Sequence, residues 1–158
     1  MRIRPLVSED REKLRQMIIR TSVFTDDEVG VAMELIDIVI GNKNQKDYTI
    51  VCTVDGHNEP AGYVCYGPVP MTQGTFDLYW IVIDPKVQGQ KIGSELLDYM
   101  EREIRELQGR MILADTSSIP SYEKANRFYL KRGFKEVARI ADYYWKGNDR
   151  ITYCKKLT

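Results

Sequence analysis

A glycine-containing loop between a strand-like run and a helix-like run is the feature that most constrains this sequence. Residues 76–83 read FDLYWIVI, the loop at 87–94 reads VQGQKIGS, and apolar residues then recur at helical spacing over 92–107. The first N–H groups of a helix lack intrahelical partners and favour an anion. Gly89 and Gly93 allow close approach to the backbone. The loop therefore indicates either a turn or a phosphate cradle.

The remaining periodicity predicts a mixed fold. Ser8 is expected to cap a first helix, and Thr25 with Glu28 fits a capping box that opens a second. Residues 48–67 read as a hairpin, and Gly133 is expected to end a later helix. The predicted order is β-α-α-β-β-β-α-β-α-β-β. It describes a single α+β domain over residues 1–158, with a central mixed, mostly antiparallel sheet flanked by about four helices.

Charge and hydropathy exclude several classes of protein. Lys and Arg number 23 and Asp and Glu number 23, so the net charge is zero and does not suggest a nucleic-acid binder. The apolar stretch MELIDIVIG is too short to span a membrane, and the N-terminus lacks a signal-peptide pattern. We therefore expect a cytoplasmic protein with neither nucleic-acid nor membrane partners.

The cysteines and the single histidine limit the chemistry. Cys52, Cys65 and Cys154 are widely spaced in strand-like runs, which favours free thiols in a reducing cytoplasm. His57 lies in the turn-like DGHNEP, without the partners of a metal site or a Ser-His or Cys-His pair. No metal is expected. Catalysis must use carboxylates, tyrosines, backbone amides or a bound co-substrate.

Two motifs together resemble the GNAT acetyltransferase superfamily. After VIDP, Gln88 and Gly93 occupy the ends of the pattern Q/R-x-x-G-x-G/A, and Lys91 stands at the usual middle glycine. The segment YEKANRFYLKRGF (122–134) is similar to N-x-x-A-x-x-F-Y-x-x-x-G-F, with Tyr122 at the asparagine. We expect Lys91 to have an ordinary helical φ, because the left-handed region would strain it by about 1 kcal/mol.

The resemblance implies acetyl-CoA as co-substrate and a specific set of cofactor-binding residues. The backbone of β-strand residues would hold the pantetheine arm, and the loop would hold the pyrophosphate. Tyr122 and Asn126 are candidates for contacts to the arm, although Asn126 faces a different direction on its helix. The full set is Ile81, Val82, Ile83, Gln88, Gly89, Gln90, Lys91, Ile92, Gly93, Ser94, Tyr122 and Asn126.

The resemblance also implies two catalytic residues. Tyr129 matches the family tyrosine that protonates the departing thiolate, and its alternative is a core tyrosine beside Phe128. Asp77 is either the general base for the amine or a solvated carboxylate at the strand end. Asp84 reads as a turn residue before Pro85. Cys65 lacks a partner that would activate it for a ping-pong route.

The residues that contact the acceptor amine are predicted from separate parts of the sequence. Candidate contacts are Phe24, Asp26, Tyr79, Tyr143 and Tyr144. Helix capping explains Asp26 equally well, and the aromatic cluster DYYW (142–145) suits either an acceptor wall or a homodimer contact.

The function predicted from these residues is an N-acetyltransferase that moves an acetyl group directly to the primary amine of a small molecule. The alternatives are a protein lysine or N-terminal acetyltransferase and a non-catalytic acyl-CoA-binding module.

Overall fold

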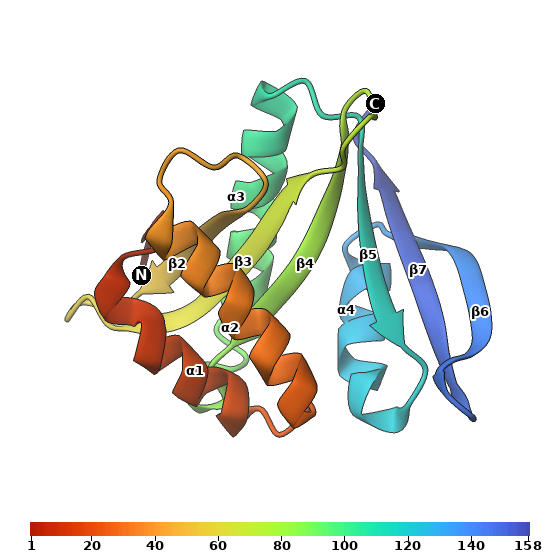
Figure 1. Cartoon of the computed structure of the whole chain (residues 1–158), viewed down its shortest axis with the longest axis horizontal. Coiled ribbons are helices and arrows are strands. Elements are labelled where there is room, and N and C mark those ends of the chain that lie inside the picture. The colour runs from red at the N-terminus through yellow and green to blue at the C-terminus, as the bar shows by residue number, and fades with distance from the viewer. The chain divides into compact units, whose positions relative to one another are not determined.

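The computed structural model describes all 158 residues, Met1 to Thr158. Seven strands and four helices follow in the predicted order (Figure 1). They are β1 (Arg2–Pro5), α1 (Arg11–Arg20), α2 (Asp26–Gly41), β2 (Thr49–Val54), β3 (Pro60–Pro68), β4 (Thr75–Ile83), α3 (Ile92–Glu106), β5 (Met111–Ser117), α4 (Glu123–Lys131), β6 (Lys135–Trp145) and β7 (Asn148–Lys156).

The strands form one mixed sheet in the order β1-β2-β3-β4-β5-β7-β6. β4 and β5 are parallel, whereas β1–β2, β2–β3, β5–β7 and β6–β7 are antiparallel. A parallel neighbour needs a crossover connection, and α3 supplies it between β4 and β5. The predicted α+β fold, with its mostly antiparallel sheet and four helices, is confirmed.

The chain divides into two compact units. Unit 1 comprises residues 1–67 and 79–103, and unit 2 comprises residues 68–78 and 104–158. A single domain over residues 1–158 stays a prediction.

Unit 1 is built around an apolar core between helices and strands. α1 and α2 lie on one face of β2 and β3, and α3 lies on the other face (Figure 1). The core under α1 and α2 contains fully buried side chains from both layers, among them Leu14, Met17, Ile18, Ile36, Val54 and Tyr63. The spacing of the helical members predicts this burial, because positions three and four apart share a helix face.

The starts of the first two helices differ in how they are capped. Thr25 Oγ1 accepts a hydrogen bond from Glu28 N at 3.2 Å, and Thr25 N donates to Glu28 Oε1 at 3.3 Å, which confirms the predicted capping box. The predicted cap by Ser8 is wrong. Ser8 begins a short 3-10 turn, and its hydroxyl donates to Glu9 instead.

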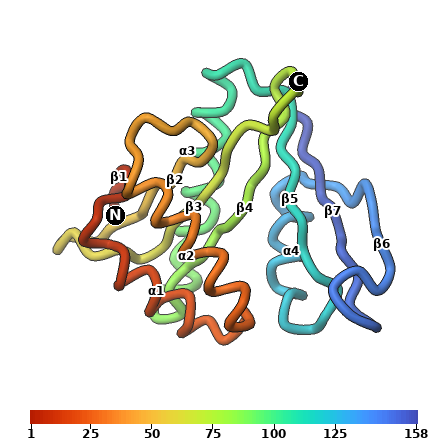
Figure 2. Tube along the Cα trace, in the orientation of Figure 1, coloured from red at the N-terminus to blue at the C-terminus, as the bar shows by residue number.

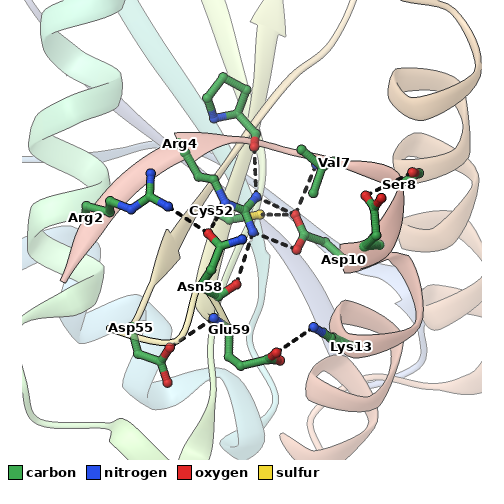
Figure 3. Close-up of polar contacts among 12 residues, drawn as sticks. Arg2, Arg4, Val7, Ser8, Asp10, Lys13, Cys52, Asp55, Asn58 and Glu59 are labelled. Atoms are coloured by element: carbon green, nitrogen blue, oxygen red, sulfur yellow. Dashed lines mark hydrogen bonds and ion pairs between the residues drawn. The ribbon is translucent and has the colours of Figure 1, made fainter.

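A buried ion pair fastens β1 to the segment before α1 (Figure 3). The Arg4 guanidinium donates to both Asp10 carboxylate oxygens, at 2.7 and 2.9 Å. It also donates to Asn58 Oδ1 at 2.8 Å, in the turn of the β2–β3 hairpin. Asp10 is 1% exposed, so this carboxylate depends on protein donors, which are Arg4, Val7 N–H and, at 3.8 Å, the Cys52 thiol.

Unit 2 contains α4 and the antiparallel strands β5, β7 and β6, whose path Figure 2 shows. α4 is fastened to the end of β5 by the Asn126 side chain, which accepts from Thr116 Oγ1 at 2.6 Å and donates to Ser117 O at 3.1 Å. The Ser117 hydroxyl in turn donates to Asn148 Oδ1 at the start of β7. β6 extends to Trp145, so it also contains the aromatic cluster at 142–145.

Candidate active site

The predicted phosphate loop lies between β4 and α3 in unit 1. Gly89 has a φ of +88°, and a Cβ built there meets no atom within 4 Å. Glu95 N–H donates to Lys91 O at 3.0 Å and is the first amide bonded into α3. The preceding amides, at residues 92–94, therefore have no intrahelical acceptor. With Gln88 to Lys91 exposed, the loop offers an open anion cradle that fits a pyrophosphate.

The backbone of Lys91 corrects one expectation. Its φ is +62°, in the left-handed region, rather than helical. Lys91 is the residue immediately before α3, where its carbonyl accepts the first helical hydrogen bond while its own φ and ψ lie outside the helix. The lysine thus adopts a conformation that a glycine would take at lower cost.

Asp84 anchors the base of this loop more strongly than the sequence indicates. Its Oδ1 accepts from Lys86 N at 3.0 Å, which confirms the predicted turn. Its Oδ2 also accepts from Arg20 Nη2, at 2.6 Å, from the last residue of α1. Burial by itself raises the pKa of Asp84, but the bonds from Arg20 and Lys86 N–H outweigh it and hold the pKa below its ordinary value. The sequence alone gives no signal for the Arg20 contact.

The end of β4 leads into the loop through the predicted pantetheine segment. Val82 is buried in the unit 1 core, while Ile81 and Ile83 are half-buried. β3 and β4 approach closely here, because a Cβ on Gly62 would lie 3.0 Å from Val82 O and 2.9 Å from Ile83 Cδ1. Asp84 N donates to Ala61 O at 2.9 Å and continues this pairing to the start of the loop.

Tyr129 lies in unit 2, in the last turn of α4. Phe134 N donates to Tyr129 O at 3.0 Å and Gly133 N donates to Leu130 O at 3.3 Å, with Gly133 at a φ of +89°. These two bonds form a Schellman motif, and its apolar contact is the Phe134 ring, 5.3 Å from the Tyr129 ring. The predicted helix end at Gly133 is confirmed. Burial raises the pKa of Tyr129 well above its ordinary value.

The other α4 candidates have different surroundings. Tyr122 ends a short 3-10 turn before α4 and is half-buried. The Asn126 amide is bonded to Thr116 and Ser117 of β5, so its oxygen and one N–H already have protein partners. The structure therefore gives Asn126 a role in fastening α4, and its predicted contact to the pantetheine arm stays a prediction.

Asp77 and Tyr79 lie two positions apart in β4 and therefore on the same face of the strand. Asp77 belongs to unit 2, where it is half-buried and in register with Leu113 of β5. Tyr79 belongs to unit 1, where it is exposed and its ring lies 5.3 Å from the ring of Tyr48. The general-base role of Asp77 stays a prediction.

The predicted acceptor residues are spread over both units. In unit 1, Phe24 packs edge-on against Trp80 at 5.1 Å, and Asp26 is exposed in the first turn of α2. In unit 2, Tyr143 and Tyr144 are 50% and 43% exposed, and their rings are 5.0 Å apart. Phe24 thus contributes to the edge of a core, which the sequence did not indicate, and the homodimer stays a prediction.

Each unit therefore brings together one part of the predicted site. Unit 1 contains the loop, the end of β4, Phe24, Asp26 and Tyr79, whereas unit 2 contains Tyr129, Tyr122, Asn126, Asp77 and the two exposed tyrosines. No group of three or more His, Cys, Asp or Glu side chains is placed to hold a metal ion. No helix is both long and apolar enough to cross a membrane.

A family profile and a solved structure agree with this arrangement. The acetyltransferase (GNAT) domain profile matches residues 45–136, which include the loop and α4. A crystal structure from Desulfovibrio desulfuricans that is assigned to the GNAT family is 35% identical, covers 99% of each chain and has a TM-score of 0.92. The chain belongs to the GNAT acetyltransferase family and is an acetyltransferase.

Two further comparisons concern proteins with known acceptors. An aminoalkylphosphonate N-acetyltransferase of Salmonella typhimurium is 41% identical over 56 residues, which span 35% of this chain and 35% of that protein. An aminoglycoside 6'-N-acetyltransferase complexed with coenzyme A is 18% identical, covers 100% of this chain and 98% of its own, and has a TM-score of 0.76. At that identity the likeness concerns the fold alone.

Proposed function

We propose that this protein transfers the acetyl group of acetyl-CoA to the primary amine of a small molecule by direct attack. The observation that carries the proposal is the loop before α3. It combines helix N-terminal amides that have no intrahelical acceptor with the open, positive-φ Gly89 and an exposed Lys91. Such a loop suits a pyrophosphate, because backbone N–H groups and the helix dipole both favour negative charge.

Acetyl-CoA supplies an activated acetyl thioester, and the protein residues orient it and manage the protons. The amides at residues 92–94 hold the pyrophosphate, and the Lys91 ammonium adds a positive charge at the loop. The backbone of Ile81, Val82 and Ile83 aligns the pantetheine arm. Asp77 accepts the proton that the attacking amine loses, and the departing sulfur is protonated by Tyr129.

The raised pKa of Tyr129 is compatible with this role. At neutral pH the phenol stays fully protonated and is ready to donate. Burial makes it a weaker acid, but burial also makes a thiolate a stronger base. The same effect is seen at Cys52 and Cys65, whose thiol pKa values burial raises to about 12. Proton transfer between two groups in one apolar environment therefore stays near balance.

The acceptor class is inferred from a named relative and from exposed aromatic side chains. The aminoalkylphosphonate N-acetyltransferase, 41% identical over 56 residues, is named for an amine of a small molecule. The solved structures of similar fold at 17–19% identity are named for small-molecule and for ribosomal-protein acceptors alike, so they do not bear on the acceptor class. Tyr143 already has the Arg150 guanidinium 4.7 Å from its ring centroid, so the exposed pair Tyr143 and Tyr144 can hold a cationic group such as an amine. Free thiols at all three cysteines suit a reducing compartment, so we place the enzyme in the cytoplasm.

The first test is acetyl-CoA binding by calorimetry, followed by thiol release with a panel of aminoalkylphosphonates, aminoglycosides, other small amines and peptides. We expect tight binding and release with one class of small amine. Release with peptides alone would contradict the small-molecule acceptor, and failure to bind acetyl-CoA would contradict the proposed loop function.

Two variants then separate the catalytic roles. Tyr129→Phe is expected to lower kcat by about 10²-fold with unchanged acetyl-CoA affinity, since only proton donation is lost. Asp77→Asn is expected to shift the pH–rate profile to higher pH. Without Asp77 as a base, only those amine molecules that have already lost their proton to the solvent can attack the thioester. A variant with wild-type turnover loses its assigned role.

A further inference from the structure

Asp84 connects three separate segments of unit 1 at the base of the phosphate loop. Its backbone N–H donates to Ala61 O of β3 at 2.9 Å, and its Oδ1 accepts from Lys86 N at 3.0 Å. Its Oδ2 accepts from Arg20 Nη2 at 2.6 Å. Asp84 is 7% exposed, so most of its hydrogen-bonding capacity is directed to these protein groups.

The connection matters because the exposed loop begins at this turn. Val87 N donates to Asp84 O at 3.0 Å, and the backbone then passes through an extended Gln88 and a left-handed Gly89 to Lys91. The residues from Gln88 to Lys91 are exposed. The conformation of an exposed segment of this kind depends on how its ends are held. α3 holds the far end, and the end of β4 with the turn at Asp84 holds the near end.

Arg20 holds Asp84, at the near end of the loop, from its position on α1. It is the last residue of α1, whose inner face is fully buried at Leu14 and Ile18. Its hydrogen bond to the largely buried Asp84 carboxylate is charge-assisted and is therefore stronger than a hydrogen bond between neutral groups. Arg20 and Asp84 line a cleft of about 480 Å³, so the pair borders solvent on one side and replacing Arg20 leaves no sealed void.

We propose that the Arg20–Asp84 pair positions the phosphate loop for acetyl-CoA, with Arg20 and Asp84 as positioning residues that do not touch the substrate. This inference rests on the proposed function of the loop. The pair keeps the loop close to its bound conformation before acetyl-CoA arrives. The loop then loses little conformational entropy on binding, and the binding free energy is more favourable.

The test compares Asp84→Asn and Arg20→Gln with the wild type. Asparagine keeps an oxygen that accepts from Lys86 N but lacks the charge that pairs with Arg20. For both variants we expect the acetyl-CoA Kd and KM to rise by about tenfold, while kcat at saturating acetyl-CoA stays within about twofold. The double variant should be no weaker than either single one, because both remove the same interaction. Arg20→Lys should restore part of the affinity.

Asp37→Asn is the matched control. It makes the same chemical change at the partner of another α1 arginine, since Arg11 Nε donates to Asp37 Oδ1 at 2.5 Å. That pair is about half exposed and lies on α1 and α2, away from the loop residues. Its loss should leave the acetyl-CoA Kd unchanged. A merely stabilising role for Arg20–Asp84 would lower the melting temperature without raising Kd.

Gly93→Trp separates this inference from the function on which it rests. It should abolish acetyl-CoA binding by obstructing the loop. If Gly93→Trp abolishes binding while Asp84→Asn and Arg20→Gln bind like the wild type, the positioning role is wrong and the loop function stands. If Gly93→Trp binds normally, the loop function fails and the inference fails with it. Should Asp84→Asn not fold, Arg20→Gln and Arg20→Lys decide the question.

Discussion

The backbone of Lys91 stores conformational free energy at the site where a ligand is expected. At a φ of +62° its Cβ is crowded in a way that a glycine avoids, at a cost of about 1–2 kcal/mol. Strained residues of this kind persist where the surrounding structure fixes them, and they concentrate at binding sites. Here the helix start fixes the residue, because Lys91 O accepts the first hydrogen bond of α3 from Glu95 N.

Lys91→Gly is therefore expected to stabilise the protein. The relief of left-handed strain is partly offset by the greater freedom of glycine in the unfolded chain, which leaves a gain of about 0.5–1 kcal/mol. Urea denaturation measures the gain. Lys91→Ala is the control, since it removes the ammonium but keeps the Cβ and should not be stabilised. Equal stability of the glycine and alanine variants would show that the left-handed backbone at residue 91 is not strained.

Among the elements, α2 illustrates how a helix is set by a few residues at its start. Thr25 and Glu28 satisfy each other's backbone N–H groups, and Asp26 and Asp27 place negative charge at the positive end of the helix dipole. α2 contributes Ile36 to the core of unit 1, so its start also determines which face meets β2 and β3.

Thr25→Ala is expected to lower the free energy of unfolding by about 1 kcal/mol, because the Glu28 N–H loses its acceptor at an exposed helix start. Chemical denaturation followed by circular dichroism measures this loss. Thr25→Ser keeps the hydroxyl and should retain wild-type stability. An alanine variant as stable as the wild type would show that the capping box contributes nothing measurable.

At the scale of the whole molecule, the pH dependence of stability depends on a group of carboxylates in unit 1. Their pKa values lie below the ordinary range for such groups. These carboxylates are Asp10, Glu12, Asp37, Asp55 and Asp84. Burial by itself raises the pKa of Asp10, but hydrogen bonds from Arg4 and Val7 N–H outweigh it. A carboxylate with a lowered folded-state pKa contributes stability above its unfolded pKa. This contribution is lost as the pH falls through the folded-state value.

We therefore expect unit 1 to lose stability below about pH 4, where ordinary carboxylates begin to protonate. Asp10→Asn should reduce stability at neutral pH by about 3 kcal/mol, because the buried Arg4 loses its counter-charge, and should weaken the acid dependence. Hydrogen exchange resolved by residue, measured from pH 7 to pH 3, tests both effects. Unchanged protection of β1 and α1 across this range would contradict them.

Local sequence patterns were sufficient for most of the fold. Capping residues, Gly133 and the alternation of apolar residues act over a few positions, so Thr25, α4 and the β2–β3 hairpin could be predicted from their neighbours. The family was predictable for a similar reason, because the loop after β4 and the end of α4 are each short, contiguous motifs. Ser8 was mispredicted because Asp10 is held by Arg4, which a local pattern does not include.

The sequence by itself determined the order of elements, the start of α2 at Thr25, the end of α4 at Gly133, the family and the position of the loop before α3, since each depends on residues close together in the chain. The tertiary structure alone decided the left-handed Lys91, the bonds of Asn126 to β5 and the pairing of Arg20 with Asp84. These features depend on which distant segments meet in space. Arg20 and Asp84 are 64 positions apart, and only packing of α1 against the sheet brings a guanidinium to that carboxylate.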